Sequence, residues 1–174
     1  AGAGTAQSAP VTPGPDDDTT APSPRPPWRL QLLGEPALSG GPDGRPALRL
    51  EPRDAAVLAR LALDGPQPRL RLAAWLWPQA DDARARGNLR QRLFRLRRAG
   101  VGELVQGDAM LQLAQPLQHD LDEALARQRE QPHWTPPELL AGVVIEDAGE
   151  CADWLDQTRR RWHARCHQAL AEQA

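Results

Sequence analysis

The sequence predicts an α+β fold: short antiparallel strands come first, helices follow, and a hairpin and a further helical segment complete the chain. Three observations support this class. Residues 28–34 alternate apolar and polar side chains, as a half-buried strand does. Apolar residues recur at helical spacing over 52–99, the pattern of amphipathic helices. Two apolar stretches then flank a short Gln106-Gly107-Asp108 turn, which indicates a hairpin.

Length and composition restrict the class of protein further. The chain of 174 residues, 40% of them hydrophobic, allows one domain, or a small domain with an appendage. It contains no apolar run of membrane-spanning length and no signal-peptide pattern. Its two cysteines, Cys151 and Cys166, favour free thiols in a reducing cytoplasm. Nucleophile-elbow, phosphate-loop and dinucleotide motifs are absent, so we expect neither an enzyme nor a cofactor.

The net charge of -2 conceals an asymmetry along the chain. Residues 27–115 hold 14 arginines against 9 acidic residues, whereas residues 116–174 hold 6 against 11. Residues 1–27 are rich in Ala, Gly, Pro, Ser and Thr, a composition that predicts a disordered tail. We therefore divide the chain into a tail (1–27), a basic module (28–115) and an acidic helical segment (116–174).

The basic module opens with three predicted strands, at 28–34, 36–38 and 47–50. Helices are expected from Pro52 to Asp64 and over 70–77, because proline suits a first helical turn and Gly65 and Pro78 follow the two patterns. A basic helix and the hairpin come next. This order is that of a helix-turn-helix followed by a wing, in which the third helix reads the DNA groove.

The basic helix spans residues 81–100. Asp81 and Asp82 suit its N-terminus, and Gly100 suits its end. Seven arginines and no acidic residue lie between these ends. Such a run is often only a solvated face. An ordinary solvated face, however, mixes charges of both signs, so the single sign favours an anionic partner.

The recurring leucines Leu89, Leu93 and Leu96 predict the buried stripe of this helix. The face opposite Leu93 carries residue types that contact base edges or phosphates. Its members are Arg84, Asn88, Gln91, Arg95 and Arg98. We expect the helix, at about 82–99, to enter the major groove of double-stranded DNA. The expected base-edge contacts are Asn88, Gln91 and Arg95, and the expected phosphate contacts are Arg84, Arg92 and Arg98.

The segment AAWLWPQADDARARGNLRQRLFRLRRAG resembles the DNA-binding domain of SARP-type transcriptional activators. The strand RLQLLGEPAL and the segment QHDLDEAL are also similar to that family. The resemblance implies an OmpR-type winged helix-turn-helix with N-terminal antiparallel strands and a C-terminal wing hairpin, followed by the start of a bacterial transcriptional activator domain. It further implies a cytoplasmic bacterial transcription regulator that binds direct repeats as a homodimer and contacts RNA polymerase, with 78–82 as a candidate polymerase contact.

The acidic segment predicts two helices, at 135–142 with a capping box and at roughly 150–172. The longer helix has an apolar stripe that we expect to meet another protomer or further helices: Cys151, Leu155, Thr158, Trp162, Cys166 and Ala169. An alternative function is therefore a protein-interaction module that uses this acidic end. His163 and His167 lie one turn apart with Cys166 between them. No glutamate lies between the histidines and Cys151 is too far away along the helix, so we expect no metal site.

Overall fold

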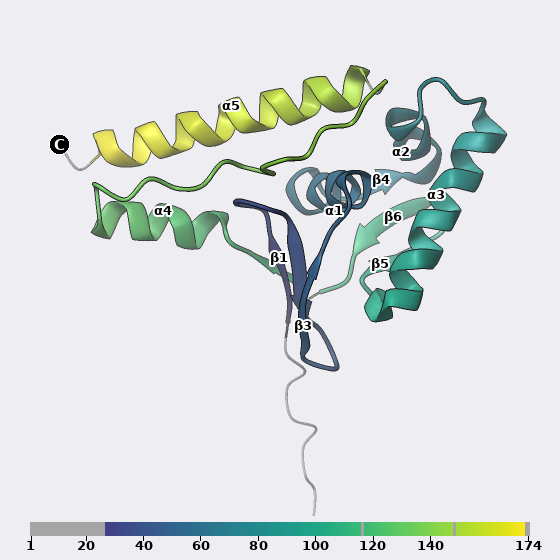
Figure 1. Cartoon of the computed structure of the whole chain (residues 1–174), viewed down its shortest axis with the longest axis horizontal. Coiled ribbons are helices and arrows are strands. Elements are labelled where there is room, and N and C mark those ends of the chain that lie inside the picture. The colour runs from purple at the N-terminus through teal and green to yellow at the C-terminus, as the bar shows by residue number, and fades with distance from the viewer. Residues whose placement is uncertain (1–26, 116, 148, 173–174) are drawn as a thin grey trace, which may run out of the picture.

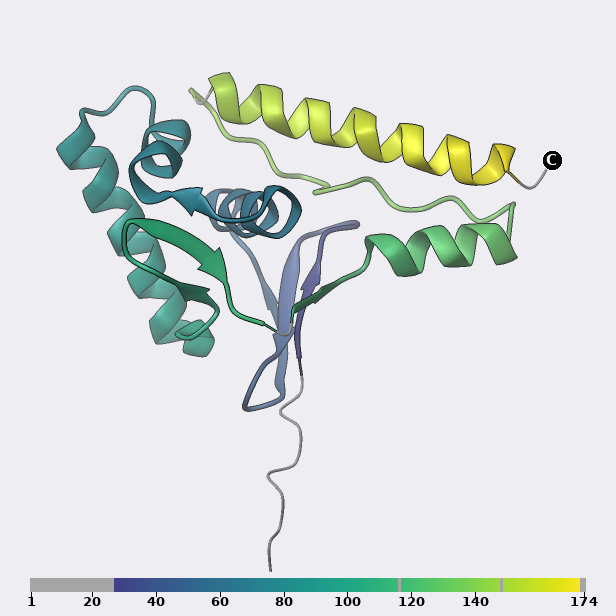
Figure 2. The ribbon, with the colours of Figure 1, turned by 180° about the vertical axis from the view of Figure 1, so that it is seen from behind.

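The structure is a computed structural model that describes residues 27–115, 117–147 and 149–172. It contains helices and two small sheets, which confirms the α+β class. The predicted tail lies outside the described residues, apart from Pro27. Helix α3 stands at one edge of the molecule and helices α4 and α5 extend toward the other, with α1 and the first sheet between them (Figures 1 and 2).

The first sheet has the strand order β3-β2-β1-β7. Strands β1 (Trp28–Gln31), β2 (Ala37–Gly40) and β3 (Arg45–Arg49) are antiparallel, as predicted. The alternation in β1 is confirmed, because its apolar side chains are buried and its polar ones exposed. Strand β7 (Leu117–His119) pairs in parallel with β1, a pairing that the sequence did not predict.

Three helices follow the first sheet: α1 (Pro52–Asp64), α2 (Arg69–Leu76) and α3 (Asp82–Leu96). All three correspond to predicted helices. A short π-helical turn, η1 (Arg97–Val101), extends α3.

The second sheet has the order β4-β6-β5 and contains the predicted hairpin. Strands β5 (Val105–Gln106) and β6 (Met110–Leu113) are antiparallel. The two-residue strand β4 (Gln67–Pro68), which precedes α2, pairs with β6. The hairpin is thereby fixed to the start of α2.

Two helices occupy the acidic part of the chain, α4 (Leu121–Glu130) and α5 (Gly149–Ala171). The helix predicted at 135–142 is wrong, because this segment is not helical: Leu139 forms a single antiparallel bridge with Leu33, and a turn follows at 140–142. The N–H of Leu140 donates to the Leu32 carbonyl at 2.7 Å, and the N–H of Gly34 donates to the Glu138 carbonyl at 2.8 Å. These long-range bonds satisfy the backbone groups that a helix would have paired internally.

The apolar stripe of α5 is buried within this chain, which corrects the expectation that another protomer or further helices cover it. Helix α5 packs on α4 and also reaches α2. Trp154 meets Trp75 edge-to-face at 5.5 Å, and its indole N–H donates to Asp64 at 2.8 Å. Buried residues on both sides of position 116 belong to one core. The basic and acidic segments are therefore packed as one unit.

None of the helices in the described ranges is long and apolar enough to cross a membrane.

Candidate nucleic-acid interface

Helix α3 is positioned by its apolar side and by its first turn. Four of its side chains are buried: Ala85, Leu89, Leu93 and Leu96. The leucines are those predicted, and they face the body of the protein, where α2 packs against α3. The carboxylate of Asp81 accepts from the N–H of Arg84 at 2.8 Å, which confirms Asp81 as the N-cap. The opposite side of α3 faces solvent at the edge of the molecule (Figure 1).

The end of α3 is fixed by a glycine and by an arginine from the first sheet. Gly100 has a φ of 86°, a left-handed conformation that ends helices and favours glycine. The guanidinium of Arg45 donates to the carbonyl of Ala99. A cation at this end also interacts favourably with the helix dipole. Strand β3 therefore helps to set the direction of α3.

The buried stripe determines which residues point outward. Because Ala85 and Leu96 are also buried, the stripe is centred to one side of Leu93, at about 100° per residue around the helix. The residues directly opposite are Gly87, Gln91, Phe94 and Arg98, which follow one another at helical spacing. We call these four residues the outer ridge. Of the predicted site residues, Gln91 and Arg98 lie on the ridge, Arg84 and Arg95 lie exposed beside it, and Asn88 is half-buried.

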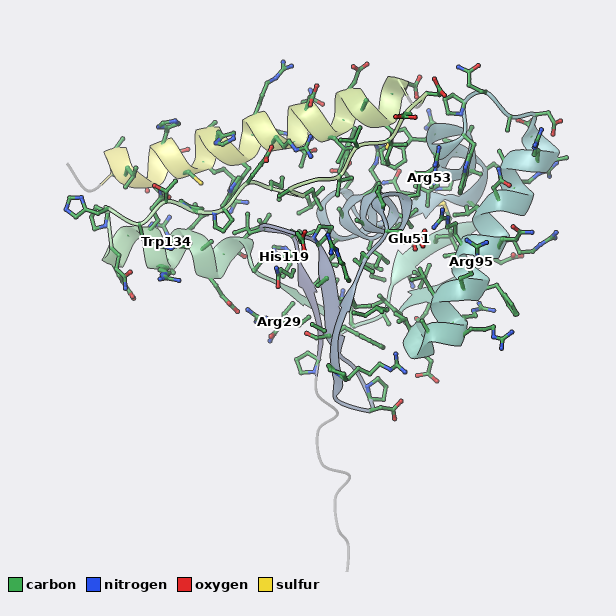
Figure 3. The ribbon with its side chains drawn as sticks, in the orientation of Figure 1. Arg29, Glu51, Arg53, Arg95, His119 and Trp134 are labelled. Atoms are coloured by element: carbon green, nitrogen blue, oxygen red, sulfur yellow. The ribbon has the colours of Figure 1, made fainter. Side chains whose placement is uncertain are left out.

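Arg92 is paired within the protein, which counts against the phosphate contact predicted for it. Its side chain is only 21% exposed and is paired with Glu51 at the start of α1. It also lies 3.6 Å from the carboxylate of Asp54, whose side chain is 11% exposed. Arg95 lies on the same flank, and its charge also acts on both carboxylates (Figure 3). Arg92 therefore holds α3 against α1.

The two carboxylates respond differently to this arrangement. Burial raises the pKa of Asp54 above its ordinary value, although the nearby Arg92 opposes the shift. The hydrogen bond from Arg92 lowers the pKa of the exposed Glu51. One oxygen of Asp54, Oδ1, is buried without a hydrogen-bond partner in the described part of the chain. The positive charge of Arg92 therefore partly offsets the cost of burying the Asp54 carboxylate.

Other arginines divide into structural and unpaired groups. Arg60 lies over the rings of Trp75 and Trp154, and Arg53 over that of Trp77, at 4.8 to 5.5 Å from the ring centres. The guanidinium groups of Arg53 and Arg60 therefore pack against tryptophan rings of the protein itself. By contrast, within the described ranges the side chains of Arg84, Arg90 and Arg97 have no ion pair or hydrogen bond. All three are exposed on α3 or η1, so their positive charges remain available to an anion.

The hairpin β5–β6 is tied to α2 through its turn. The guanidinium of Arg69 donates to the carbonyl of Asp108 at 2.7 Å, and the Arg69 N–H donates to Ala109 at 2.9 Å. Gly107 has a φ of 100°, and a Cβ at this position would overlap the Met110 carbonyl oxygen. The turn therefore requires glycine. The Arg69 guanidinium therefore places a positive charge at the turn of the hairpin.

Phe94 was missed at the sequence level, where it was assigned to neither face of the helix. Its side chain is 57% exposed. The signal was present, since Phe94 lies about 100° away from Leu93 around the helix and outside the leucine stripe.

Side chains elsewhere do not form a metal centre in the part of the chain that the structure describes. His163 and His167 are exposed on α5, and no group of three or more potential ligands is present in the described ranges. Cys151 and Cys166 are free and buried. Burial raises the pKa of the Cys151 thiol to about 12, which is unfavourable for a nucleophilic thiolate.

Comparisons with protein-family models, with curated proteins and with solved structures found no match to this chain.

Proposed function

We propose that the protein binds double-stranded DNA through the outer side of α3 and acts as a transcription regulator with a winged helix-turn-helix. The observation that carries this proposal is the charge on that side. Arg84, Arg90 and Arg97 have no partner within the described residues, and α3 contains no acidic residue after Asp82. Like charges on one helix repel one another, and phosphates would relieve this repulsion while releasing counterions.

The arrangement around α3 also supports this function. Helix α2 packs against α3, and the β5–β6 hairpin follows α3 and η1 in the chain. In a winged helix-turn-helix, the third helix enters the major groove. Here Arg69 of α2, whose guanidinium is bound to the hairpin turn, would contact the neighbouring phosphates beside the wing. Gln91 and Arg95 are exposed and are side chains of the types that read base edges. We assign these two residues, with half-buried Asn88 at the rim, to base recognition.

The proposed assembly on DNA is a homodimer, and the turn at 78–82 before α3 is the proposed contact for RNA polymerase. Both assignments rest on the resemblance to SARP-type activators. Asp81 already serves as the N-cap of α3, so the polymerase contact would have to use its free carboxylate oxygen or its neighbours.

Fluorescence anisotropy tests the proposed function directly. The full chain is titrated into labelled duplexes, one of random sequence and others from a randomised pool after selection, across a series of KCl concentrations. We expect the logarithm of affinity to fall linearly with the logarithm of salt concentration, with tighter binding to the selected duplex. An absence of binding at low salt would reject the proposal and leave the protein-interaction module as the alternative.

A further inference from the structure

Phe94 exposes most of its phenyl ring to solvent. It projects from the outer ridge of α3 with 57% of its surface accessible, whereas the leucines of the same helix are buried. Scattered exposed apolar residues are common on protein surfaces. Phe94 differs from that background because it occupies the centre of a strongly cationic face.

The neighbours of Phe94 define the chemistry of whatever contacts it. Arg90 lies one turn before it and Arg98 one turn after it, with the Arg98 guanidinium 6.0 Å from the ring centre. Gln91 is adjacent on the ridge. A partner for this surface must therefore be anionic at its periphery, and it must present an apolar group and hydrogen-bonding groups between its charges.

The major groove of DNA meets this description. Phosphates line its two edges, and the 5-methyl group of thymine is an apolar group on its floor. Phenylalanine is among the side chains that contact this methyl group, and glutamine pairs with adenine in the same groove. Gly87, the first residue of the outer ridge, has no atom within 4 Å of the position of a Cβ, so the helix surface is open at that point.

We propose that Phe94 is a specificity-determining residue that contacts the 5-methyl group of a thymine, so that the protein prefers thymine to uracil at that position. This inference rests on the proposed function and adds the identity of a base to it. A thymine methyl group against the Phe94 ring removes more apolar surface from water than the hydrogen atom of uracil does. This additional burial favours the thymine complex.

An anionic membrane surface also combines negative charge with apolar material. Helices that lie in a bilayer surface bury a broad apolar face there. The apolar face of α3 is instead buried in the protein core, through Ala85, Leu89, Leu93 and Leu96. Phe94 alone is a large exposed apolar side chain on α3, so the structure favours DNA.

The test replaces thymine by deoxyuridine, which removes only the methyl group. A duplex selected by the full chain from a randomised pool is synthesised with deoxyuridine at one thymine at a time. Its affinity is then measured by anisotropy for the wild type and for Phe94→Ala. For the wild type we expect a loss of about fourfold at one position or more, the value of one buried methyl-sized group. For Phe94→Ala we expect the thymine and deoxyuridine duplexes to bind equally at that position.

Two matched variants control this comparison. Phe94→Leu keeps an apolar side chain and should keep part of the preference for thymine. Arg90→Gln removes a neighbouring charge and should weaken both duplexes alike. Because Phe94 is exposed, circular dichroism should show that Phe94→Ala is folded like the wild type.

The outcomes separate this inference from the proposed function. If duplexes bind with a steep salt dependence but deoxyuridine has no effect at any position, or an equal effect in Phe94→Ala, the thymine contact is rejected and DNA binding stands. A selected site without thymine rejects it as well. If no duplex binds at low salt, both proposals fail. Co-sedimentation with phosphatidylglycerol vesicles that is lost in Phe94→Ala would then assign the residue to a bilayer.

Discussion

Replacing Arg92 by alanine tests whether the ion pair between α3 and α1 stabilises the fold. In the wild type, the Arg92 guanidinium lies 3.6 Å from the carboxylate of Asp54, a residue that is 8% exposed. At this distance the attraction is about 4–5 kcal/mol at an effective dielectric constant of about 20. Desolvation of the two groups offsets much of it. We expect Arg92→Ala to lower the free energy of unfolding at neutral pH by about 1–3 kcal/mol.

The pH dependence follows from the two carboxylates. The folded-state pKa of Asp54 is raised, so the stability that it contributes is present below its unfolded-state pKa and is lost as pH rises through the folded-state pKa. Without Arg92 that pKa rises further, and the loss extends to higher pH. The pKa of Glu51 is lowered by Arg92, so its contribution is present above its unfolded-state pKa and is lost in acid. Both effects make Arg92→Ala most destabilising near neutral pH and least so below about pH 4.

Urea unfolding of four proteins provides the assay: the wild type, Arg92→Ala, Asp54→Asn and the double variant. Asp54→Asn removes the buried charge, so Arg92→Ala should cost less in that background, with a coupling free energy of at least about 0.5–1 kcal/mol. Arg90→Ala is the matched control, because Arg90 is exposed on the same helix without a partner in the described residues. Equal effects of Arg92→Ala and Arg90→Ala, or an equal cost of Arg92→Ala in both backgrounds, would refute this reasoning.

Three further predictions concern the hairpin, the thiols and the acidic segment. Gly107→Ala should destabilise the protein by about 1–3 kcal/mol, because its φ is 100° and a Cβ would overlap the Met110 carbonyl; an unchanged urea midpoint would contradict this. Cys151 and Cys166 are buried with raised pKa values, so iodoacetamide at about pH 8 should label them slowly until urea is added; rapid labelling of the native protein would show that they are accessible. Removing residues 116–174 should abolish cooperative thermal unfolding, because it strips α5 from the shared core; a truncated chain with an unchanged transition would show that the basic module folds alone.

The elements that the sequence predicted well are those with a repeated local pattern. Strand β1 alternates over four residues, and α3 carries a leucine stripe and an aspartate cap. Each pattern reflects burial on one side, which the structure shows. Strand β7 has only three residues and pairs in parallel with β1 across the whole domain. A segment so short has no readable period, and its partner cannot be inferred from local sequence.

The segment at 135–142 shows local and long-range preferences in competition. Its capping box favours a helix. Two kinds of hydrogen bond keep it non-helical instead. Its backbone bonds to the residues that follow β1, and the Arg159 guanidinium donates to the carbonyls of Leu139, Leu140 and Val143. Tertiary contacts override local propensity in such cases. The sequence offered no signal for the arginine that lies far away along the chain.

The candidate site was predictable as a surface and less so residue by residue. Arg84, Gln91, Arg95 and Arg98 are exposed as predicted. Arg92 was predicted to contact a phosphate although it lies off the face opposite Leu93, and the buried Ala85 shifts the apolar stripe toward the flank that carries Arg92. The sequence also could not show that two carboxylates of α1 would meet this flank.

Under the proposed function, the arginines of α3 and η1 bind DNA, and positive charge elsewhere on the protein does not. This assignment is tested most directly by the salt dependence of affinity for a random-sequence duplex in two variants of equal charge. One carries Arg90→Gln and Arg97→Gln, and the other carries Arg160→Gln and Arg161→Gln on the exposed side of α5. We predict that the first variant lowers the slope of log affinity against log salt by about two relative to the wild type, while the second leaves it unchanged. Equal slopes in the two variants, or a larger change for the α5 pair, would contradict DNA binding through α3.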